Sequence, residues 1–491
     1  MVTLKRLYAE MLGRNLNYRF RPEHLESLKK RQLGLDYDPP SRTIETRYGP
    51  MVEEIIPTSL EPLHISPKLW SKMQVLCRAW EAFFQLAFRW YTQPDTCPGS
   101  DPYNLIGQGT ERQMANHNPG YRPLLPFVRY DCMEREDGSL VVIDVNSSRP
   151  IGASHMQGLG NLFVEMGLSD IAPPNFSQAI ADVMMDCYKQ WRELRKDRKA
   201  RPEVGIVIPE HMGSVPDFLI LAQLLRTDSR FASVRVIDPQ DLCYDSSKKQ
   251  LSMIDAQGRD QGRLDLVLRT VKPDLDPTIA PALLQAYPDS ACIVSPLYHR
   301  WLGSKFWFVI AQKEPYRSII IQKLGGELAE VLFNSMPKSG LYHGGRVYFS
   351  DQDVDLESLR HKDWVAKVGS GSSSRGIIIG KTSSKSRWLE DLLGMSDGRM
   401  VFQEYTPPYK YTFTYPDAEG HPQTGVFKTK LGLYAFGGKA VGFECMGCMN
   451  SEKIHGSRST LIMPVLHAST QREQETRGIW TPGPSHSPQP A

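Results

Sequence analysis

The chain has 491 residues, 41% of them hydrophobic and 23% charged, and this balance is ordinary for a globular protein that can build several cores. Its 58 lysines and arginines exceed its 55 aspartates and glutamates by only 3, which gives no electrostatic reason to expect nucleic acid or a membrane surface as a partner. Without a membrane-length apolar run or a secretory signal, we expect a cytoplasmic protein with reduced cysteines; the oligomeric state stays open.

The first 125 residues are expected to be mostly helical. The clearest helix is predicted from about Pro67 to Tyr91, where apolar residues recur at steps of three and four. These residues are Leu69, Met73, Leu76, Trp80, Phe83, Phe84 and Phe88. A stripe with this spacing is typical of a helix that packs on a core, and we interpret it in that way.

Residues 126–150 predict a β-hairpin with a two-residue turn at Asp137-Gly138. A turn at these two residues fixes the register of the strands. Asp131 then faces Asp144, and Arg129 faces Asn146. All four side chains share one face, because side chains alternate along a strand.

Two carboxylates directly opposite each other destabilise a hairpin unless a positive charge lies between them. Mg²⁺ prefers carboxylate and amide oxygens, with water and phosphates completing its shell. The hairpin therefore predicts a metal site at Asp131, Asp144 and Asn146, with Arg129 placed to stabilise a phosphoryl group. An ordinary solvent-facing hairpin would explain the polar residues, but it would not explain the facing acids or their apolar flanks.

The chain after the hairpin alternates between short apolar runs and helical stretches. A helix is predicted over about 176–198, followed by strands near 204–209, 233–238 and 264–271 and a helix over 216–226. Such alternation favours a small α/β domain with a parallel sheet. From about 297 to 463 the pattern is mixed α+β, with strands near 364–368, 376–380, 400–405, 425–434 and 440–444, and the last two dozen residues are typical of a disordered tail.

A glycine- and serine-rich loop between two predicted strands is a candidate phosphate site, because glycine lets backbone N–H groups approach phosphate oxygens. Lys367 ends the first of these strands and could meet the phosphates as a point charge. The candidate loop residues are Gly369, Ser370, Gly371, Ser372 and Gly376. A plain flexible hairpin loop is the alternative.

A strand that ends in Gln403-Glu404-Tyr405 and runs into two prolines suits a hinge that binds adenine and ribose, although an ordinary strand end has the same pattern. Lys428 and Lys430 share one face of a later strand and could reach phosphates. Lys305 stands where a helix is predicted to begin. Exposed surface lysines are the alternative for all three.

Taken in order, these motifs resemble the circularly permuted ATP-grasp family, in particular the synthetase domain of glutathionylspermidine synthase. That family has Arg-x-Asp, then Glu-x-Asn and a proline, then a Pro-x-Tyr stretch before a lysine, a lysine strand with a glycine-rich loop, and a Gln-Glu hinge. The matching positions are Arg129 and Asp131, Asp144, Asn146 and Pro150, Pro296 to Tyr298, Lys305, Lys367 to Gly376, and Gln403-Glu404. The resemblance covers roughly residues 125–466. Two departures are an aspartate at 144, where the family has glutamate, and no arginine near the end of the strand at 441–446, for which Arg458 is a possible replacement.

The resemblance implies an α+β / α/β chain with an ATP-grasp fold, in which two α+β lobes clasp ATP in circularly permuted order. It divides the chain into a helical region (1–125), a segment with the metal hairpin (126–200), a Rossmann-like pre-ATP-grasp domain (203–296), nucleotide-binding lobes (297–466) and a tail (467–491). The implied activity is an ATP- and Mg²⁺-dependent carboxylate–amine ligase that acts through an acyl phosphate on small molecules such as an amino acid, peptide or polyamine. A kinase for a hydroxyl group and a degenerate nucleotide-binding partner module remain alternatives.

Overall fold

The structure, a computed structural model, describes residues 10–11, 18–22, 41–46, 49–55, 57–106, 119–122, 125–147, 149–196, 199–209, 212, 214–271, 280–296, 299–369, 376–395, 399–416, 421–454 and 460–467. The predicted disordered tail lies outside these residues, apart from residue 467, which ends a strand.

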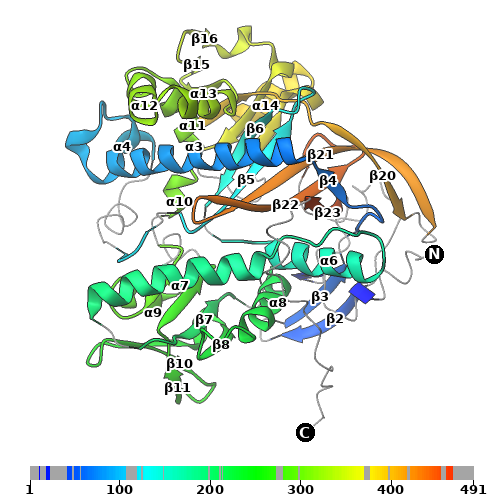
Figure 1. The fold of residues 1–491 in the computed structure, drawn as a ribbon. Coiled ribbons are helices and arrows are strands. Elements are labelled where there is room, and N and C mark those ends of the chain that lie inside the picture. The colour runs from blue at the N-terminus through cyan, green and yellow to red at the C-terminus, as the bar shows by residue number, and fades with distance from the viewer. Residues whose placement is uncertain are drawn as a thin grey trace.

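A seven-stranded sheet joins strands from distant parts of the chain (Figure 1). Its strands are β4 (Leu63–Ile65), β5 (Phe127–Glu134), β6 (Leu140–Asn146), β20 (Lys410–Pro416), β21 (Pro422–Phe436), β22 (Lys439–Cys448) and β23 (Leu461–His467). The order is β4-β23-β22-β21-β5-β6, and β20 pairs with β21. The predicted hairpin, β5 and β6, therefore joins a sheet built mainly from the last quarter of the chain.

A six-stranded antiparallel sheet carries the predicted lysine strand and hinge strand. In the order β16-β15-β14-β19-β17-β18, its strands are β16 (Asp353–Asp355), β15 (Arg346–Tyr348), β14 (Ser339–His343), β19 (Met400–Glu404), β17 (Trp364–Val368) and β18 (Ile377–Ile379). Helices near it are α10 (His299–Leu302), α11 (Phe306–Gln312), α12 (Tyr316–Leu324), α13 (Gly326–Asn334) and α14 (Lys385–Leu393). Lys305 immediately precedes α11, as the sequence predicts.

A parallel sheet forms in the predicted α/β region, with the order β13-β12-β7-β8. Its strands are β7 (Glu203–Val207), β8 (Ser233–Ile237), β12 (Leu266–Arg269) and β13 (Cys292–Val294), accompanied by α6 (Ala153–Glu165), α7 (Phe176–Arg195), α8 (Val215–Arg226) and α9 (Pro281–Ala286). The small antiparallel strands β9 (Leu242–Asp245), β10 (Gln250–Ile254) and β11 (Asp260–Arg263) were not predicted. In Figure 1 this part occupies the lower half of the molecule.

The expectation of a mostly helical N-terminal region is wrong for its first half. There, β1 (Tyr18–Pro22), β2 (Ser41–Thr46) and β3 (Gly49–Ile55) form an antiparallel sheet in the order β1-β3-β2. Runs such as Ser-Arg-Thr-Ile-Glu-Thr contain β-branched residues that suit a strand, but they are too short to stand out in a search for helical periodicity. The second half does hold the predicted helix, α3 (Pro67–Thr92), and the short α4 (Asp101–Leu105).

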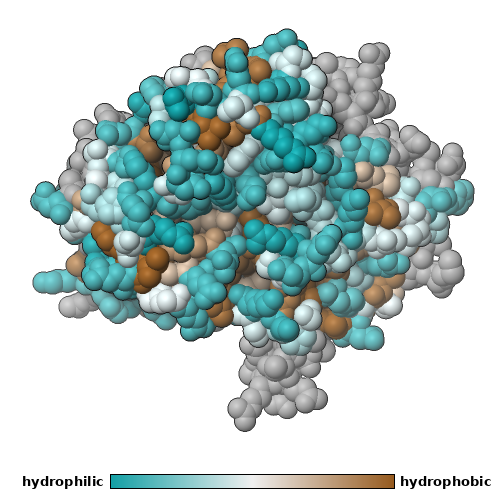
Figure 2. Space-filling view, turned by 90° about the horizontal axis from the view of Figure 1, so that it is seen from above, coloured by the Kyte–Doolittle hydropathy of each residue, from teal (hydrophilic) through white to brown (hydrophobic). Residues whose placement is uncertain are grey.

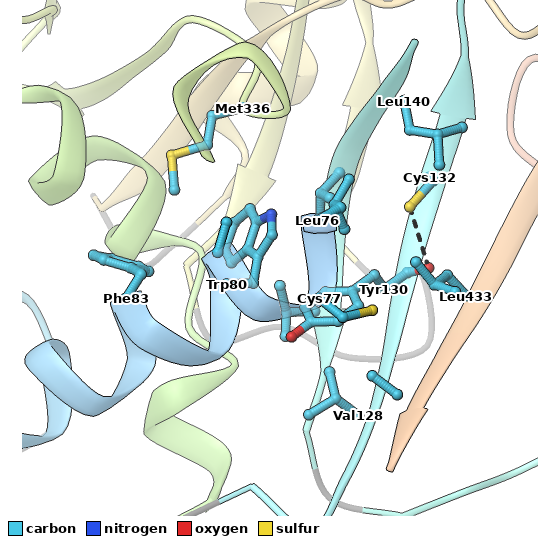
Figure 3. Close-up of a cluster of buried hydrophobic side chains, with 14 of the residues drawn as sticks. Leu76, Cys77, Trp80, Phe83, Val128, Tyr130, Cys132, Leu140, Met336 and Leu433 are labelled. Atoms are coloured by element: carbon cyan, nitrogen blue, oxygen red, sulfur yellow. Dashed lines mark hydrogen bonds between the residues drawn. The ribbon is translucent and has the colours of Figure 1, made fainter. Parts of the chain in front are cut away.

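Helix α3 packs its aromatic stripe into the largest core, as predicted. Ser66 caps the helix by accepting the Leu69 N–H, and Pro67 occupies its first turn. The Trp80 ring lies 5.8 Å from that of Tyr130 on β5 and 5.3 Å from that of Phe308 on α11, and its indole N–H donates to Ser335 Oγ at 3.0 Å. Figure 3 shows Trp80 between the hairpin strands and Met336. One helix therefore supports both the hairpin and the segment that begins at Lys305.

Hydrophobic side chains are dispersed on the face of the molecule shown in Figure 2. On the face in Figure 2, hydrophobic residues form separate small groups among hydrophilic ones. Among the described residues, no helix is long and apolar enough to cross a bilayer. All eight cysteines are free thiols, as expected from the sequence.

Candidate functional site

The hairpin brings the two predicted acids face to face, but its loop length and strand pairing differ from those expected. Near the turn, Glu134 pairs with Leu140, and the Arg135 N–H donates to the carbonyl of Ser139, so the loop has three residues instead of two. Gly138 occupies the left-handed region at φ +71°, as this loop type requires. A β-bulge at Ile143 then adds one residue to β6 and restores the predicted pairs, Asp131 with Asp144 and Arg129 with Asn146.

Positive side chains from three other positions neutralise the facing acids. Asp131 accepts from Arg129 Nε at 2.8 Å and from Lys430 Nζ at 2.7 Å. Asp144 pairs with Lys305 Nζ at 3.0 Å. Burial alone would raise the pKa of Asp131, but Arg129 and Lys430 lower it well below its ordinary value. The protein itself thus supplies the positive charge that the sequence argument assigned to a metal.

Lys367 approaches the same acids from the other sheet. It lies one residue before the end of β17, is almost fully buried, and donates to the carbonyl of Ile143 at 2.7 Å. Burial lowers the pKa of the Lys367 ammonium to about 7, with Lys305 adding repulsion and Asp144 opposing the shift. A lysine in this setting is poised to gain a proton when anionic oxygens arrive.

A pocket with a cavity volume of about 80 Å³ lies between the two sheets. Its lining residues are Asp131, Met133, Ile143, Asp144, Val365, Lys367, Ile377, Ile379, Gln403, Glu404, Tyr405, Thr406, Pro408, Lys430, Glu452, Lys453 and Ile454. The charged residues Asp131, Asp144, Lys367 and Lys430 come from four strands, β5, β6, β17 and β21.

Much of the pocket lining beyond these charges is apolar, and it includes a single buried amide. Val365 faces Ile379 on one neighbouring strand and Gln403 on the other, so these side chains share one face of the six-stranded sheet. Met133 and Ile143 contribute from the hairpin. The Gln403 side chain is 1% exposed, and neither of its polar atoms has a hydrogen-bond partner among the described residues. Because buried amides are normally satisfied, Gln403 is suited to bind a polar edge of a ligand.

The hinge residues lie at the rim of this pocket and are tied to a loop after β22. Glu404 is exposed, while Tyr405 donates its hydroxyl to Glu452 at 2.6 Å. Lys428 also binds Glu452, at 2.6 Å, and does not line the pocket. Of the two lysines predicted on β21, only Lys430 therefore reaches the pocket charges.

The remaining predicted residues are placed as follows. Gly369 is buried, and its carbonyl accepts the Lys305 N–H at 2.9 Å; a Cβ there would meet the Phe306 ring at 2.2 Å, so its small size also serves packing. Gly376 has a φ of +69°. Ser370, Gly371 and Ser372 lie outside the described residues, as does Arg458, the possible replacement for the missing arginine.

Asp131, Asp144 and Asn146 are too few to hold a Mg²⁺ ion by themselves. They fit better a Mg²⁺ ion that is also bound by the phosphates of a ligand. No group of three His, Cys, Asp or Glu side chains among the described residues could hold a metal. Two facing carboxylates and the side-chain oxygen of Asn146 would supply part of an oxygen shell. Mg²⁺ commonly binds one or two carboxylates together with substrate phosphates, which matches this incomplete set.

The sequence interpretation missed two functional neighbours, Glu444 and Tyr434. Glu444 lies 2.7 Å from Arg129 Nη1 and accepts from the Tyr434 hydroxyl at 2.8 Å. Burial raises the pKa of Glu444, although Arg129 opposes the shift. The available signal was a glutamate between Phe443 and Cys445 in an otherwise apolar strand, since such a position is costly for an acid without a partner.

Comparisons with known proteins show the fold. No protein-family model matches the chain, and no curated protein is similar to it in sequence. Among solved structures, a glutathione synthetase-like effector from Globodera pallida, in its apo form, has a TM-score of 0.54 and 14% identity, covering 85% of this chain and 91% of that one. A protein assigned as a gamma-glutamylcysteine synthetase from Methylobacillus flagellatus has a TM-score of 0.39 and 10% identity, covering 81% and 86%, which is too distant to support an argument. The chain thus has a mixed α/β fold similar to that of a glutathione synthetase-like protein.

Proposed function

We propose that this protein is an ATP-dependent carboxylate–amine ligase of the ATP-grasp type, which forms an amide or peptide bond through an acyl phosphate and releases ADP and phosphate. The observation that carries the proposal is the pocket itself. Lys367 and the facing acids meet in one pocket whose lining is otherwise largely apolar and contains the unsatisfied amide of Gln403. A nucleoside triphosphate has the matching form, with a flat base and a chain of charged phosphates.

In this proposal the lysines bind ATP, and the acids hold the ion that accompanies it. Lys367, Lys430 and Lys305 would exchange their present partners for phosphate oxygens. Asp131, Asp144 and Asn146 would bind Mg²⁺, whose chemistry is to neutralise the charge of the phosphates during transfer. Gln403 would bind the edge of the base, and Glu404 lies where it could accept a ribose hydroxyl.

Arg129 is proposed as the catalytic residue. Its Nε and Nη1 are bound to Asp131, Glu444 and the carbonyl of Ile151, whereas no described residue binds Nη2. A guanidinium held in this way can present its remaining N–H groups to the phosphoryl group as charge develops. The substrate carboxylate would attack the γ-phosphate, and the amine would then displace phosphate from the acyl phosphate.

The name of the Globodera pallida neighbour, a glutathione synthetase-like effector, supports a ligase of this kind and substrates such as amino acids or short peptides. The circularly permuted order and the five-part division of the chain also belong to the proposal. They are supported by the pairing of β5 with β21, which places the early hairpin beside late strands.

Calorimetry of ATP binding, with and without Mg²⁺ at about 5 mM, tests the proposal. We expect Mg²⁺ to tighten ATP binding in the wild type, on the order of tenfold or 1.4 kcal/mol. Asp144→Ala should lose this gain, because it removes one of the two facing carboxylates. Glu136→Ala, an exposed acid in the same hairpin, is the matched control and should keep it. Failure of the wild type to bind ATP would refute the proposed function.

A further inference from the structure

Three neighbouring strands place Arg129 and Glu444 on either side of a glycine. Gly432 on β21 pairs with Asp131 on β5 and with Glu444 on β22. Since Gly432 has no side chain, the guanidinium of Arg129 reaches across β21 to Glu444 Oε1, 2.7 Å from its Nη1. A Cβ on Gly432 would lie 2.7 Å from Glu444 Cγ and 2.9 Å from Arg129 Cδ. The ion pair therefore depends on a gap in the middle strand.

A second gap admits the other contact of Glu444. The hydroxyl of Tyr434 lies 2.8 Å from Glu444 Oε2 and 2.7 Å from the carbonyl of Ile151. Gly152, with a φ of +91°, lies against this pair, and a Cβ there would be 2.5 Å from the Tyr434 hydroxyl and 2.7 Å from Glu444 Oε2. One oxygen of this carboxylate, which is only 2% exposed, thus accepts a hydrogen bond from Tyr434, and the other forms the ion pair with Arg129.

Stability alone gives little reason for this arrangement. Taking an acid and a guanidinium out of water is costly, and apolar residues of similar volume often serve stability as well or better. The same charges do, however, fix the orientation of the Arg129 guanidinium, because a guanidinium bound on two sides retains little freedom to rotate. The exposed fraction of the Arg129 side chain is 16%, so the group is anchored but still reaches solvent.

We propose that Glu444 is a positioning residue for Arg129, held in place by Tyr434 and admitted by the missing side chain of Gly432. Glu444 and Asp131 contact the guanidinium at Nη1 and Nε and leave its Nη2 available to a phosphoryl group. The role of Arg129 in this statement rests on the proposed function. In this proposal a glutamate within β22 acts on the site, where the family resemblance led us to expect an arginine in the same stretch.

Because a positioning residue acts before and during the reaction, its loss has a specific signature. Binding of Mg·ATP in the ground state should change little, since Glu444 does not line the pocket. Stabilisation of a phosphoryl group in transfer should fall, because alignment contributes most when charge is developing.

The first experiment measures how firmly Arg129 is held, without any nucleotide. Phenylglyoxal modifies accessible arginines, and peptide mass spectrometry gives the modification rate at each one. In Glu444→Gln we expect Arg129 to react faster than in the wild type, on the order of tenfold, because the ion pair that holds its Nη1 is lost. An unchanged rate at Arg129 would overturn the proposal, whether or not the protein binds ATP.

The second experiment measures the consequence for phosphoryl transfer. Aluminium fluoride with Mg·ADP imitates the phosphoryl group in transfer, so the ratio of its affinity to that of Mg·ATP reports transition-state alignment. Glu444→Gln and Tyr434→Phe should reduce this ratio, by about tenfold for Glu444→Gln, while the Kd for Mg·ATP stays within about twofold. Equal loss of both affinities would indicate a merely structural role and contradict the proposal. Failure of the wild type to bind Mg·ATP would refute the proposed function instead, and the phenylglyoxal rates would still decide whether Glu444 holds Arg129.

A matched control exists in the same sheet. Glu134 on β5 is also buried and accepts from the hydroxyl of Tyr411 on β20 at 2.6 Å, but neither residue lines the pocket. Glu134→Gln should leave the Arg129 modification rate and the affinity ratio unchanged. If Glu134→Gln and Glu444→Gln behave alike, the effect comes from a buried glutamate in general, and the proposal is wrong.

Discussion

Lys367 shows how burial can prepare one side chain for the proposed binding of phosphates. The ammonium sits between the two sheets, with Asp144 as its largest favourable neighbour and Lys305 as its largest unfavourable one. Its pKa of about 7 means that it is mostly neutral at pH 8 in the free protein. Phosphate oxygens would favour the charged form and raise that pKa, so binding of ATP at pH 8 should draw a proton from solution.

Calorimetry in buffers of different ionisation enthalpy measures this proton. At pH 8 we expect the wild type to take up nearly one proton per ATP bound, because Lys367 changes from mostly neutral to mostly charged when its pKa rises. Lys367→Met should abolish the uptake and weaken binding. Lys428→Met, which removes a lysine bound to Glu452 outside the pocket, should retain the uptake. Uptake that persists in Lys367→Met would assign the proton to another group.

At the scale of the element, helix α6 begins with a cap from another helix. Gly152 precedes α6 and has no side chain to cap it, and Asp217 of α8 accepts the N–H groups of Gly152 at 2.8 Å and His155 at 3.0 Å. This carboxylate thereby ties the parallel-sheet region to the loop that follows the hairpin. Burial raises the pKa of Asp217 to about 6, against the effect of these N–H groups.

Asp217→Ala should lower the free energy of unfolding by about 1–3 kcal/mol, because buried N–H groups lose their acceptor. Asp217→Asn tests the pH dependence. Since the folded pKa lies above the unfolded value, the native state binds more protons between about pH 4 and 6, and the carboxyl contribution is lost as the pH rises through 6. Thermal unfolding should therefore show a wild-type advantage over Asp217→Asn that shrinks from pH 4 to pH 7. An advantage that grows with pH would contradict the direction of this shift.

The sequence predicts elements best where local pattern and environment agree. The strands near 204–209 and 233–238, the helix over 67–91 and the hinge strand appear within a few residues of their predicted bounds. The hairpin register was predicted correctly only because two errors cancel: the turn is one residue longer than expected, and the bulge at Ile143 compensates. A bulge reflects tertiary contacts, so no local pattern announces it.

The candidate site was predictable in its residue types more than in its contacts. The facing acids Asp131 and Asp144 follow from strand periodicity. The pairs Lys305 with Asp144 and Arg129 with Glu444 join positions far apart in the chain, and only the strand order reveals them. The contact across Gly432 needs the register of three strands at once, which a single sequence does not provide.

At the scale of the whole molecule, the largest core couples the two sheets that line the pocket. Trp80 of α3 touches Tyr130 of the hairpin and Phe308 of the helix that follows Lys305 (Figure 3). The N-terminal helix is thus part of the framework that sets the distance between Asp144 and Lys305. This gives a physical role to a region that matches no motif of the resembled family.

Trp80→Ala should destabilise the protein by about 3–5 kcal/mol and also weaken ATP binding, because the cavity loosens both walls of the pocket. Trp191→Ala is the matched control, since this tryptophan is buried in a separate core and its indole N–H binds the carbonyl of Pro288 at 2.9 Å. It should destabilise to a similar degree but leave the Kd for ATP unchanged. Thermal unfolding and calorimetry on both variants distinguish a framework role from general loss of stability.

The bulge at Ile143 has a consequence for how this segment tolerates change. The bulge leaves Ile143 without a partner on β5, and its carbonyl accepts the Lys367 ammonium. Every amino acid carries that carbonyl, so a library of substitutions at this position should mostly keep the lysine anchored. Deleting Ile143 would instead remove the bulge and the carbonyl that binds Lys367, while Asp144 would still pair with Asp131, because the strands would then pair regularly from the turn onward. For the contact with Lys367, the number of residues in β6 therefore matters more than which amino acid stands at position 143.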